Sequence, residues 1–260
     1  MLADTRHARI LSRVADVGEA SVQDLSDWLD VSTATIRRDL AALDAQGRLL
    51  RVRGGGRAIP RPPTEAPFEE AEERPFQEVA LTSHSSKGDV ARRAAELVAD
   101  GDIVILDIGT TTSLIARQLR GRAVTVVTAS LAVLDELRDD PSVELVLLGG
   151  TLRRSYHSLV GPITEMGLQH LRATIAFVGT SGIAPDGTVL DTTVVEVPAK
   201  RAIIASAARV VLVADETKFP GTGLLSVCEP GSIHTLVASK RSDAATLSTL
   251  SDLGIEVIYA

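Results

Sequence analysis

The chain has 260 residues, of which 45% are hydrophobic and 23% are charged, as in ordinary soluble globular proteins. The length allows one large domain or two unequal ones, and no apolar run reaches the roughly 18 residues of a membrane-spanning helix. The N-terminal residues lack the apolar stretch of a signal peptide, and the single cysteine, Cys228, can form neither an internal disulfide nor a zinc site by itself. These features predict a reduced, cytoplasmic protein that needs no metal or cofactor.

The net charge of −7 is distributed unevenly along the chain. Residues 31–61 hold seven arginines and two aspartates, a local charge of +5, so the rest of the chain carries −12. A basic segment joined to an acidic body suggests a nucleic-acid partner for one part of the chain only.

The basic segment belongs to a small N-terminal domain, predicted to span residues 1–59. Its pattern predicts three helices, which run from about Thr5 to Val17, from Ser21 onward, and from Ser32 to about Gly47. A short hairpin around the triple glycine at 54–56 follows, so the whole pattern is typical of a winged helix-turn-helix. The side chains expected to face inward are Ile10, Leu11, Val14, Leu25, Trp28, Leu29, Ile36, Leu40 and Leu43.

The third helix has the chemistry of a DNA-reading helix. Its face opposite Ile36 presents Ala34 and Arg38, flanked by Thr35 and Arg37. A small residue permits close approach, threonine can bond a phosphate or a base, and arginine can bond guanine or phosphate. The alternative is a solvated helix face whose charges only keep the protein soluble. The short turn before the helix and the basic hairpin after it favour DNA recognition.

Residues 60–76 are rich in proline and glutamate and predict a linker. Residues 77–260 then predict a larger α/β domain, because apolar strands alternate with helical segments, as in a parallel sheet that is covered on both faces. Asp186 with Gly187 predicts a hairpin turn within this domain. The expected strands lie at 102–107, 123–128, 143–150, 174–179, 209–214, 234–238 and 255–259.

The carboxyl ends of these strands predict a ligand site, because open parallel sheets bind ligands there. After the first strand, Gly109 lets the backbone approach a ligand, and the N-terminus of the next helix with Thr110 and Thr111 forms an anion site. Threonines that merely cap this helix are the alternative. Backbone N–H groups and a lysine would take a phosphate, and carboxylates would take sugar hydroxyls. Other strand ends bring to the same edge Thr128, Ser130, Gly149, Gly150, Asp215 and Lys218.

The N-terminal stretch resembles the winged helix-turn-helix of the DeoR family of bacterial transcriptional regulators. The residues that carry the resemblance are VS, TIRRDL, a downstream glycine and RVRGG; the family often has alanine at the position of Gly56. The resemblance implies a DNA-contacting helix with Ser32, Thr33, Thr35, Arg37 and Arg38, and a wing with Arg51, Arg53 and Arg57.

Later blocks are similar to the C-terminal sensor of the same family, among them KGDVARRAAELVADGDIVILDIGTTT, LLGGTLRRSYHSLVGP and VVLVADETKF. Such sensors are similar in fold to ribose-5-phosphate isomerase, glucosamine-6-phosphate deaminase and CoA-transferase domains. The resemblance implies a phosphorylated sugar or polyol effector near Lys87, Asp107, Gly109, Thr110, Thr111, Gly149, Gly150 and Lys218.

Four residues of the sensor bear on this resemblance: two match the family pattern and two depart from it. Glu196 and Lys200 match a family Glu and Lys, although a salt bridge between positions i and i+4 explains them equally well. Ala129 stands where the family usually has Asn. Pro198 stands where a helical residue is usual, so the helix there is predicted to start near Val197.

The sequence therefore predicts a DNA-binding transcriptional regulator, by resemblance a repressor of carbohydrate-metabolism genes. A homo-oligomer, dimer or tetramer, would bring two or more winged helices to a repeated operator. The alternative is a sugar-phosphate isomerase or deaminase with a DNA-binding appendage. Asp107 and Asp191 are the candidates for acid or base catalysis, and both have structural or ligand-binding explanations, so we expect no enzyme.

Overall fold

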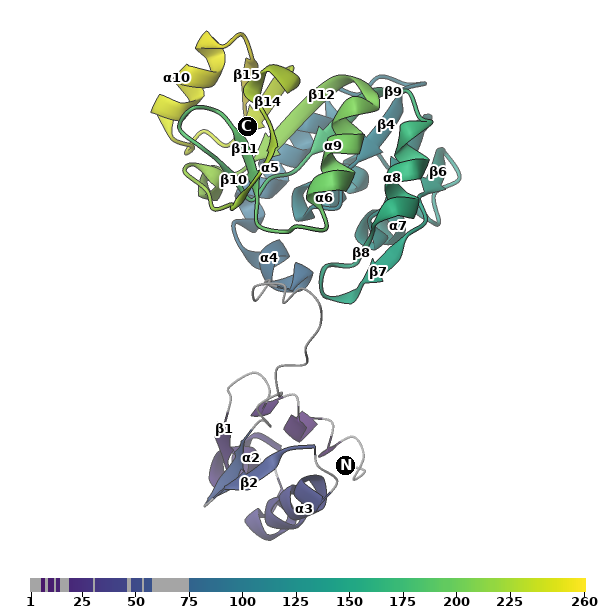
Figure 1. Cartoon of the computed structure of the whole chain (residues 1–260). Helices are drawn as coiled ribbons and strands as arrows, with labels where there is room; N and C mark the ends of the chain where they lie inside the picture. Colours follow the sequence, from purple (N-terminus) through teal and green to yellow (C-terminus); the bar gives the residue numbers. More distant parts are fainter. Residues whose placement is uncertain are drawn as a thin grey trace. The chain divides into compact units, whose positions relative to one another are not determined.

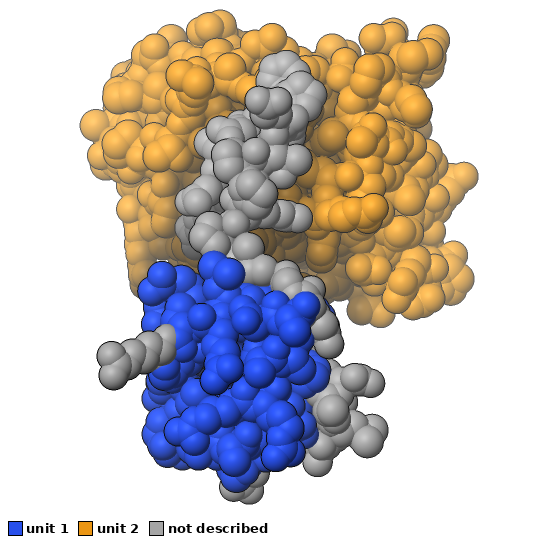
Figure 2. All heavy atoms as spheres, turned by 60° about the horizontal axis from the view of Figure 1, so that its bottom comes forward, with its two compact units in different colours: residues 1–69 blue, residues 70–260 orange. Residues whose placement is uncertain are grey.

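The computed structural model describes residues 6, 7, 9–11, 13, 14, 19–29, 31–45, 48–52, 54–57 and 75–260. The chain divides into two compact units, residues 1–69 and 70–260 (Figure 2). This division falls inside the segment expected to be a linker, of which residues 60–74 lie outside the described residues. In the part of the chain that the structure describes, no helix is long and apolar enough to cross a membrane.

The first unit combines helices with a small antiparallel sheet (Figure 1). A helix that includes Ile10 and Val14 is followed by α2 (Val22–Leu29) and α3 (Thr33–Ala45). The predicted hairpin is confirmed as β2 (Leu50–Val52) and β3 (Gly55–Arg57), which pair antiparallel. A third strand, β1 (Glu19–Ser21), pairs with the other side of β3. Its three residues show no alternation long enough to predict a strand.

The core of the first unit confirms the predicted inward face, with one correction at Trp28. This side chain is 43% exposed, and its ring lies 4.6 Å from the guanidinium carbon of Arg9 and 5.8 Å from that of Arg13. Trp28 lies at the edge of the apolar stripe of α2, where cation–π contacts with the first helix cover it in part. The side chains buried as predicted are Ile10, Val14, Leu25, Leu29, Ile36, Leu40 and Leu43, while Leu11 packs half-buried against them.

A seven-stranded sheet, parallel throughout, forms the centre of the second unit (Figure 1). Its strand order is β15-β14-β12-β9-β4-β5-β6. Each strand coincides with one of the seven apolar runs of the sequence, so the predicted strands and the parallel sheet are confirmed. The strands are β4 (Ile103–Leu106), β5 (Val124–Thr128), β6 (Val143–Leu147), β9 (Ala173–Val178), β12 (Ala207–Ala214), β14 (Thr235–Ala238) and β15 (Glu256–Tyr259).

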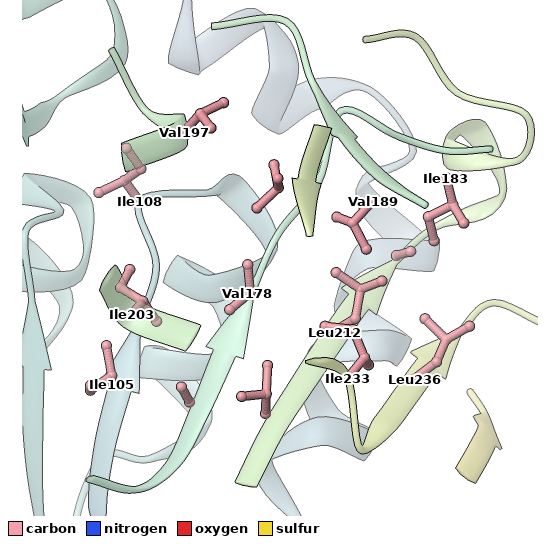
Figure 3. Packing of buried hydrophobic residues seen from close by; sticks show 14 of the residues in the cluster. Ile105, Ile108, Val178, Ile183, Val189, Val197, Ile203, Leu212, Ile233 and Leu236 are labelled. Atoms are coloured by element: carbon pink, nitrogen blue, oxygen red, sulfur yellow. The ribbon is translucent and has the colours of Figure 1, made fainter. Parts of the chain in front are cut away.

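Helices cover both faces of this sheet, as its apolar strands require. One face packs against α5 (His84–Ala95), α6 (Thr110–Gln118) and α7 (Leu131–Leu137). The other packs against α8 (Pro162–Gln169), α9 (Val197–Ala205) and α10 (Ala244–Asp252). Strand β12 shows the alternation: Val211 and Val213 face the first set, and Leu212 faces the second, near Ile233 (Figure 3). Helix α9 begins at Val197, as Pro198 predicted.

Short elements complete the second unit and were not predicted individually. Helix α4 (Phe76–Leu81) comes first. Strands β7 (Thr151–Arg153) and β8 (Ser158–Val160) form a hairpin around the 3-10 turn η1 (Arg154–Tyr156). Strands β10 (Gly182–Ile183), β11 (Val189–Asp191) and β13 (Leu225–Cys228) form an antiparallel sheet. The predicted turn at Gly187 is confirmed, because it joins β10 to β11 with a φ of +87°.

Candidate functional site

The N-terminus of α3 holds the hydroxyl groups predicted to meet DNA. The Oγ of Ser32 accepts a hydrogen bond from the backbone N of Thr35 at 3.2 Å, and the two hydroxyls lie 2.9 Å apart. This is an N-cap, and it leaves Ser32 exposed with Thr33 and Thr35 half-buried. The cap thus fixes the start of the helix whose outer face is available to a partner.

The three charged residues of the RRD sequence in α3 have different environments. Arg37 and Arg38 are exposed, whereas Asp39 is only 6% exposed. Its carboxylate accepts hydrogen bonds from Nε of Arg6 at 2.5 Å and contacts Nε2 of His7 at 3.1 Å. Burial alone would raise the pKa of Asp39, but the bonds from Arg6 and His7 hold that pKa below its ordinary value. Asp39 therefore fastens α3 to the first helix and directs both arginines outward.

The wing places its arginines on the surface beside acidic residues. The backbone N of Arg51 donates to Oδ1 of Asp44 at 2.9 Å, and the Arg51 side chain is exposed. Nη2 of Arg57 donates to Oε2 of Glu19 at 2.7 Å in an exposed ion pair between β3 and β1. Arg53 lies outside the described residues.

Glycines let the wing lie close to the rest of the first unit. A Cβ atom on Gly55 would lie 2.2 Å from the carbonyl oxygen of Ala20 on β1. A Cβ atom on Gly56 would lie 2.8 Å from Cδ2 of Leu40 in α3, so the alanine that the family often has here would require Leu40 to move. Gly55 therefore allows β3 to lie close to β1, and Gly56 allows the wing to lie close to α3.

The second unit has a cavity between β4 and β9, where the side of the sheet to which the chain adds strands reverses. From β4 the chain adds strands toward β6, and from β9 it adds strands toward β15, so the connections after β4 and β9 lead away from each other. Such a switch point leaves a crevice at the carboxyl ends of the two strands. Gly109, Thr110 and Thr111 after β4, and 179–181 after β9, line a cavity of about 390 Å³.

Five of the residues predicted to lie near a ligand line this cavity together: Lys87, Gly109, Thr110, Thr111 and Lys218. They come from α5, from the β4–α6 connection and the first turn of α6, and from the 3-10 turn η2 (Glu216–Lys218). Gly109 is the N-cap residue of α6, and the hydroxyl of Thr112 donates to the carbonyl oxygens of Asp107 and Gly109 at 2.6 and 2.8 Å. Since Thr112 holds the turn, the first-turn N–H groups of α6 remain for a ligand.

Three predicted side chains bond to the protein itself instead of lining the cavity. The Thr128 hydroxyl donates to the Leu106 carbonyl at 2.8 Å, and Ser130 caps α7 by accepting from the Val133 N–H. Asp215 accepts hydrogen bonds from the N–H and the hydroxyl of Thr217. These side chains shape the strand ends that surround the cavity.

The two glycines predicted after the third strand, Gly149 and Gly150, also lie outside the cavity lining. The carbonyl oxygen of Gly149 accepts a hydrogen bond from the Thr164 hydroxyl at 2.7 Å. A Cβ atom on Gly150 would lie 2.3 Å from that same hydroxyl oxygen. Both glycines therefore serve the close approach of α8 to the end of β6, and not the approach of a ligand.

A buried charge cluster forms the floor of the cavity. Nζ of Lys200 lies 2.5 Å from Oδ2 of Asp107, 3.0 Å from the carbonyl oxygen of Gly179 and 3.6 Å from Oδ2 of Asp191. Burial would lower the pKa of Lys200, but Asp107, Asp191 and Glu196 raise it above its ordinary value, so Lys200 is positively charged. These partners of Lys200 all lie outside its own helix. A salt bridge between Glu196 and Lys200 at positions i and i+4 is therefore not needed to explain the lysine at this position.

Glu196 takes part in a second buried pair at the cavity wall. It accepts a hydrogen bond from Nη1 of Arg153, and the Arg153 guanidinium lies 4.8 Å from the centre of the Tyr156 ring. Burial raises the pKa of Glu196 to about 7, against the lowering effect of Lys200 and Arg153. Arg153 and Tyr156 were missed from the sequence, because their hairpin gives no strand-end signal.

Several hydroxyl groups in the wall were also missed: Thr180, Ser181, Thr192 and Thr193. Two runs of the sequence, GTSG after β9 and DTT after β11, resemble the GTTT run after β4 and could have indicated them. Oδ1 of Asp191 accepts from the Thr193 N–H at 3.0 Å, which orders this wall. The cavity therefore combines cationic groups, hydroxyls and carboxylates around a helix N-terminus.

Comparisons with known proteins match both units. Residues 6–61 match the DeoR-like helix-turn-helix domain, and residues 82–240 match the DeoR C terminal sensor domain. The chain is 30% identical over 260 residues to the HTH-type transcriptional repressor CsqR of Escherichia coli K12, covering 99% of this chain and 96% of that protein. It is 29% identical over 253 residues to the glycerol-3-phosphate regulon repressor of the same organism, covering 97% of each. These matches confirm the resemblance predicted from the sequence.

A putative aga operon transcriptional repressor of Escherichia coli O157:H7 is 33% identical over 254 residues, covering 97% of this chain and 92% of that protein. Among solved structures, ribose 5-phosphate isomerase A from Methanocaldococcus jannaschii is similar with a TM-score of 0.40 and 19% identity, covering 53% of this chain and 55% of that one.

Proposed function

The chain belongs to the DeoR family of transcriptional regulators, and from this premise we propose that it represses genes of carbohydrate metabolism. The first unit would bind operator DNA through α3 and the wing. The second unit would bind a phosphorylated sugar or polyol in its cavity and thereby change operator affinity. Relatives named as repressors, one of a glycerol-3-phosphate regulon, support this proposal.

The cavity at the switch point is the observation that carries the effector proposal. We place the phosphate at the N-terminus of α6, within reach of Lys87 and Lys218, because helix N–H groups and ammonium groups favour a dianion. We place the hydroxyl groups of the effector toward Asp191 and the hydroxyls of Thr192 and Thr193. The cavity has room for a small ligand of this kind, since small-molecule sites begin at about 300 Å³.

We propose that the DNA contacts are those of the exposed face of the first unit. Arg37 and Arg38 extend from α3, and Arg51 extends from the wing. Ser32, Thr33 and Thr35 supply hydroxyl groups at the helix N-terminus, where backbone N–H groups attract phosphate. Arg57 would have to exchange Glu19 for a phosphate.

The relatives of this chain support a sensor rather than an enzyme, since relatives that are similar over nearly its whole length are named as repressors. Among the carboxylates at the cavity, Oδ2 of Asp107 accepts hydrogen bonds from Lys200 and from the N–H of Gly179 at 3.0 Å, and Oδ1 of Asp191 accepts from the N–H of Thr193. Oδ1 of Asp107 has no hydrogen-bond partner among the described residues. We propose that these carboxylates order the cavity and bind the ligand without converting it.

We also propose a homo-oligomer, because one winged helix buries too little surface to select an operator alone. Light scattering on the full chain tests this part of the proposal. A monomer at the concentrations that saturate operator DNA would contradict it.

A ligand panel with two readouts tests the proposed function. Thermal unfolding is followed with glycerol 3-phosphate, hexose 6-phosphates, inorganic phosphate and the unphosphorylated parent compounds. A true effector stabilises the folded state in proportion to the logarithm of its concentration above its dissociation constant. The same compound should change the mobility shift of DNA taken from upstream of the gene. Turnover of a sugar phosphate that is lost in Asp191→Asn would favour the isomerase alternative.

A further inference from the structure

Helix α4 buries little of its own surface against the second unit. Of its six residues only Phe76 is buried, whereas Leu81 is 79% exposed. Its N-cap residue, Pro75, offers no side-chain hydrogen bond. So short a helix is unstable by itself in water, and its stability must come from what it touches. The partners of α4 therefore decide whether it is docked.

Those partners include side chains that line the effector cavity. Nζ of Lys87 donates to the carbonyl oxygen of Val79 at 2.5 Å, and that carbonyl belongs to the last turn of α4, where carbonyls lack helical partners. The ring of Phe76 packs edge-on against Tyr156, with 5.5 Å between ring centres, and stacks on His157 at 5.7 Å. Lys87 and Tyr156 line the cavity, and so does Val79 itself.

We infer that α4 is a strap whose docking is coupled to occupation of the cavity, an inference that rests on the effector site proposed above. Docked α4 supplies Val79 to the cavity wall and holds the Lys87 ammonium in place. A phosphate that bonds Lys87 therefore binds the docked state more tightly than the undocked state. Because such coupling is reciprocal, the ligand shifts α4 toward docking.

The position of α4 in the chain gives this docking a regulatory consequence. Among the described residues, α4 is the first element of the second unit that follows the DNA-binding unit along the sequence. An undocked α4 lengthens the segment that connects the two units, whereas a docked α4 shortens it. The length of a connecting segment sets the effective concentration of the modules that it joins, so docking changes how two winged helices reach an operator.

Hydrogen exchange on the full-length chain tests the strap. Exchange of the Val79 and Thr82 amides reports α4, because these N–H groups donate to Pro75 and Glu78. Exchange of the first turn of α6 reports occupation of the cavity. The probes are inorganic phosphate and glycerol 3-phosphate, each compared with chloride at equal ionic strength. We expect both regions to be protected together, with the α4 amides slowed several-fold.

Three variants separate the strap from the cavity. Phe76→Ala removes an anchor of α4 without changing a residue assigned to the ligand, and Lys87→Met removes the bond to Val79. Without ligand, both should speed exchange in α4 by about tenfold, the effect of losing a charge-assisted bond or its equivalent in packing. Leu81→Ala changes an exposed residue of the same helix and should change exchange little.

The outcomes distinguish the two proposals. Protection of α6 without protection of α4 would leave the effector site standing and overturn the strap. Protection of neither region by any probe would refute the phosphate site and the coupling together. Unchanged α4 exchange in both Phe76→Ala and Lys87→Met would show that other contacts hold the helix, and would overturn the inference even if ligand binds.

Discussion

The two units use their charged residues in opposite ways. The first unit exposes Arg37 and Arg38 and buries Asp39 as a structural anchor. The second unit buries Lys200, Asp107 and Asp191 together beneath its cavity. Exposed arginines remain available to an extended polyanion such as DNA. Buried and mutually bonded charges instead provide a rigid polar floor, which a small ligand can meet without reorganising it. The difference shows that charge alone does not locate a binding site, because the partner of each charge decides its role.

Removing the cation of the buried cluster should have the largest effect. Lys200→Met leaves two buried carboxylates without their partner, and we expect a loss of about 3–5 kcal/mol in the free energy of unfolding of the second unit. Chemical denaturation followed by circular dichroism measures this loss. Lys240→Met, at an exposed lysine, is the matched control and should be nearly neutral. Equal stability of the two variants would contradict a structural role for the cluster.

Asp39→Asn should destabilise the first unit by about 1.5–3 kcal/mol, since it weakens charge-assisted bonds from Arg6 and His7. Trp28 is the only tryptophan of the chain, so its fluorescence follows unfolding of this unit. Asp27→Asn, at an exposed carboxylate of α2, serves as the control.

The pairing of Asp39 with Arg6 and His7 makes the stability of the first unit depend on pH. The pKa of Asp39 is lowered in the folded state, so its contribution to stability is complete above about pH 4, the ordinary carboxyl value, and is lost as the pH falls through the folded pKa. Fluorescence-detected unfolding between pH 3 and 7 should show this loss in the unsubstituted chain and less of it in Asp39→Asn. Parallel pH profiles of the two chains would rule out the linkage.

Arg38→Ala should weaken operator binding by about 1–3 kcal/mol while leaving ligand-induced stabilisation intact. Mobility shifts at several salt concentrations measure the affinity and its salt slope. Arg120→Ala removes an exposed arginine of the second unit and should leave operator affinity unchanged. If Arg38→Ala lost both DNA binding and ligand stabilisation, Arg38 would instead support the fold.

Glu19→Gln should have the smallest effect, within about 1 kcal/mol of stability, because its ion pair with Arg57 is exposed. Freed from Glu19, Arg57 should bind DNA slightly more tightly at low salt. A decrease in affinity would mean that Glu19 positions Arg57 for its contact. Such a decrease would show that in the wing, too, the partner of a charge decides the role of that charge.

Local patterns were sufficient to predict most of the architecture. The apolar runs of the strands predicted the parallel sheet because each strand is buried on both faces, and Pro198 predicted the start of α9 because proline fits only the first turn. Trp28 was predicted to face inward but is 43% exposed, because it lies at the edge of the apolar stripe of α2, where only arginines of a neighbouring helix cover its ring in part. Helical periodicity does not reveal that neighbour.

Local signals in the sequence were enough to predict the order of the elements, the basic first unit, the capped α3 and the glycine turn that opens α6. These features depend on residues within one or two turns of each other, so their physics is local. The partners of the buried charges, in contrast, depend on how distant segments pack. Lys200 of α9 meets Asp107 from 93 positions earlier, and Arg153 of the β7–β8 hairpin meets Glu196 at the N-cap of α9, because the fold brings these distant chain segments together around one cavity. Such pairings follow from the packing of the whole sheet and from no single segment of sequence.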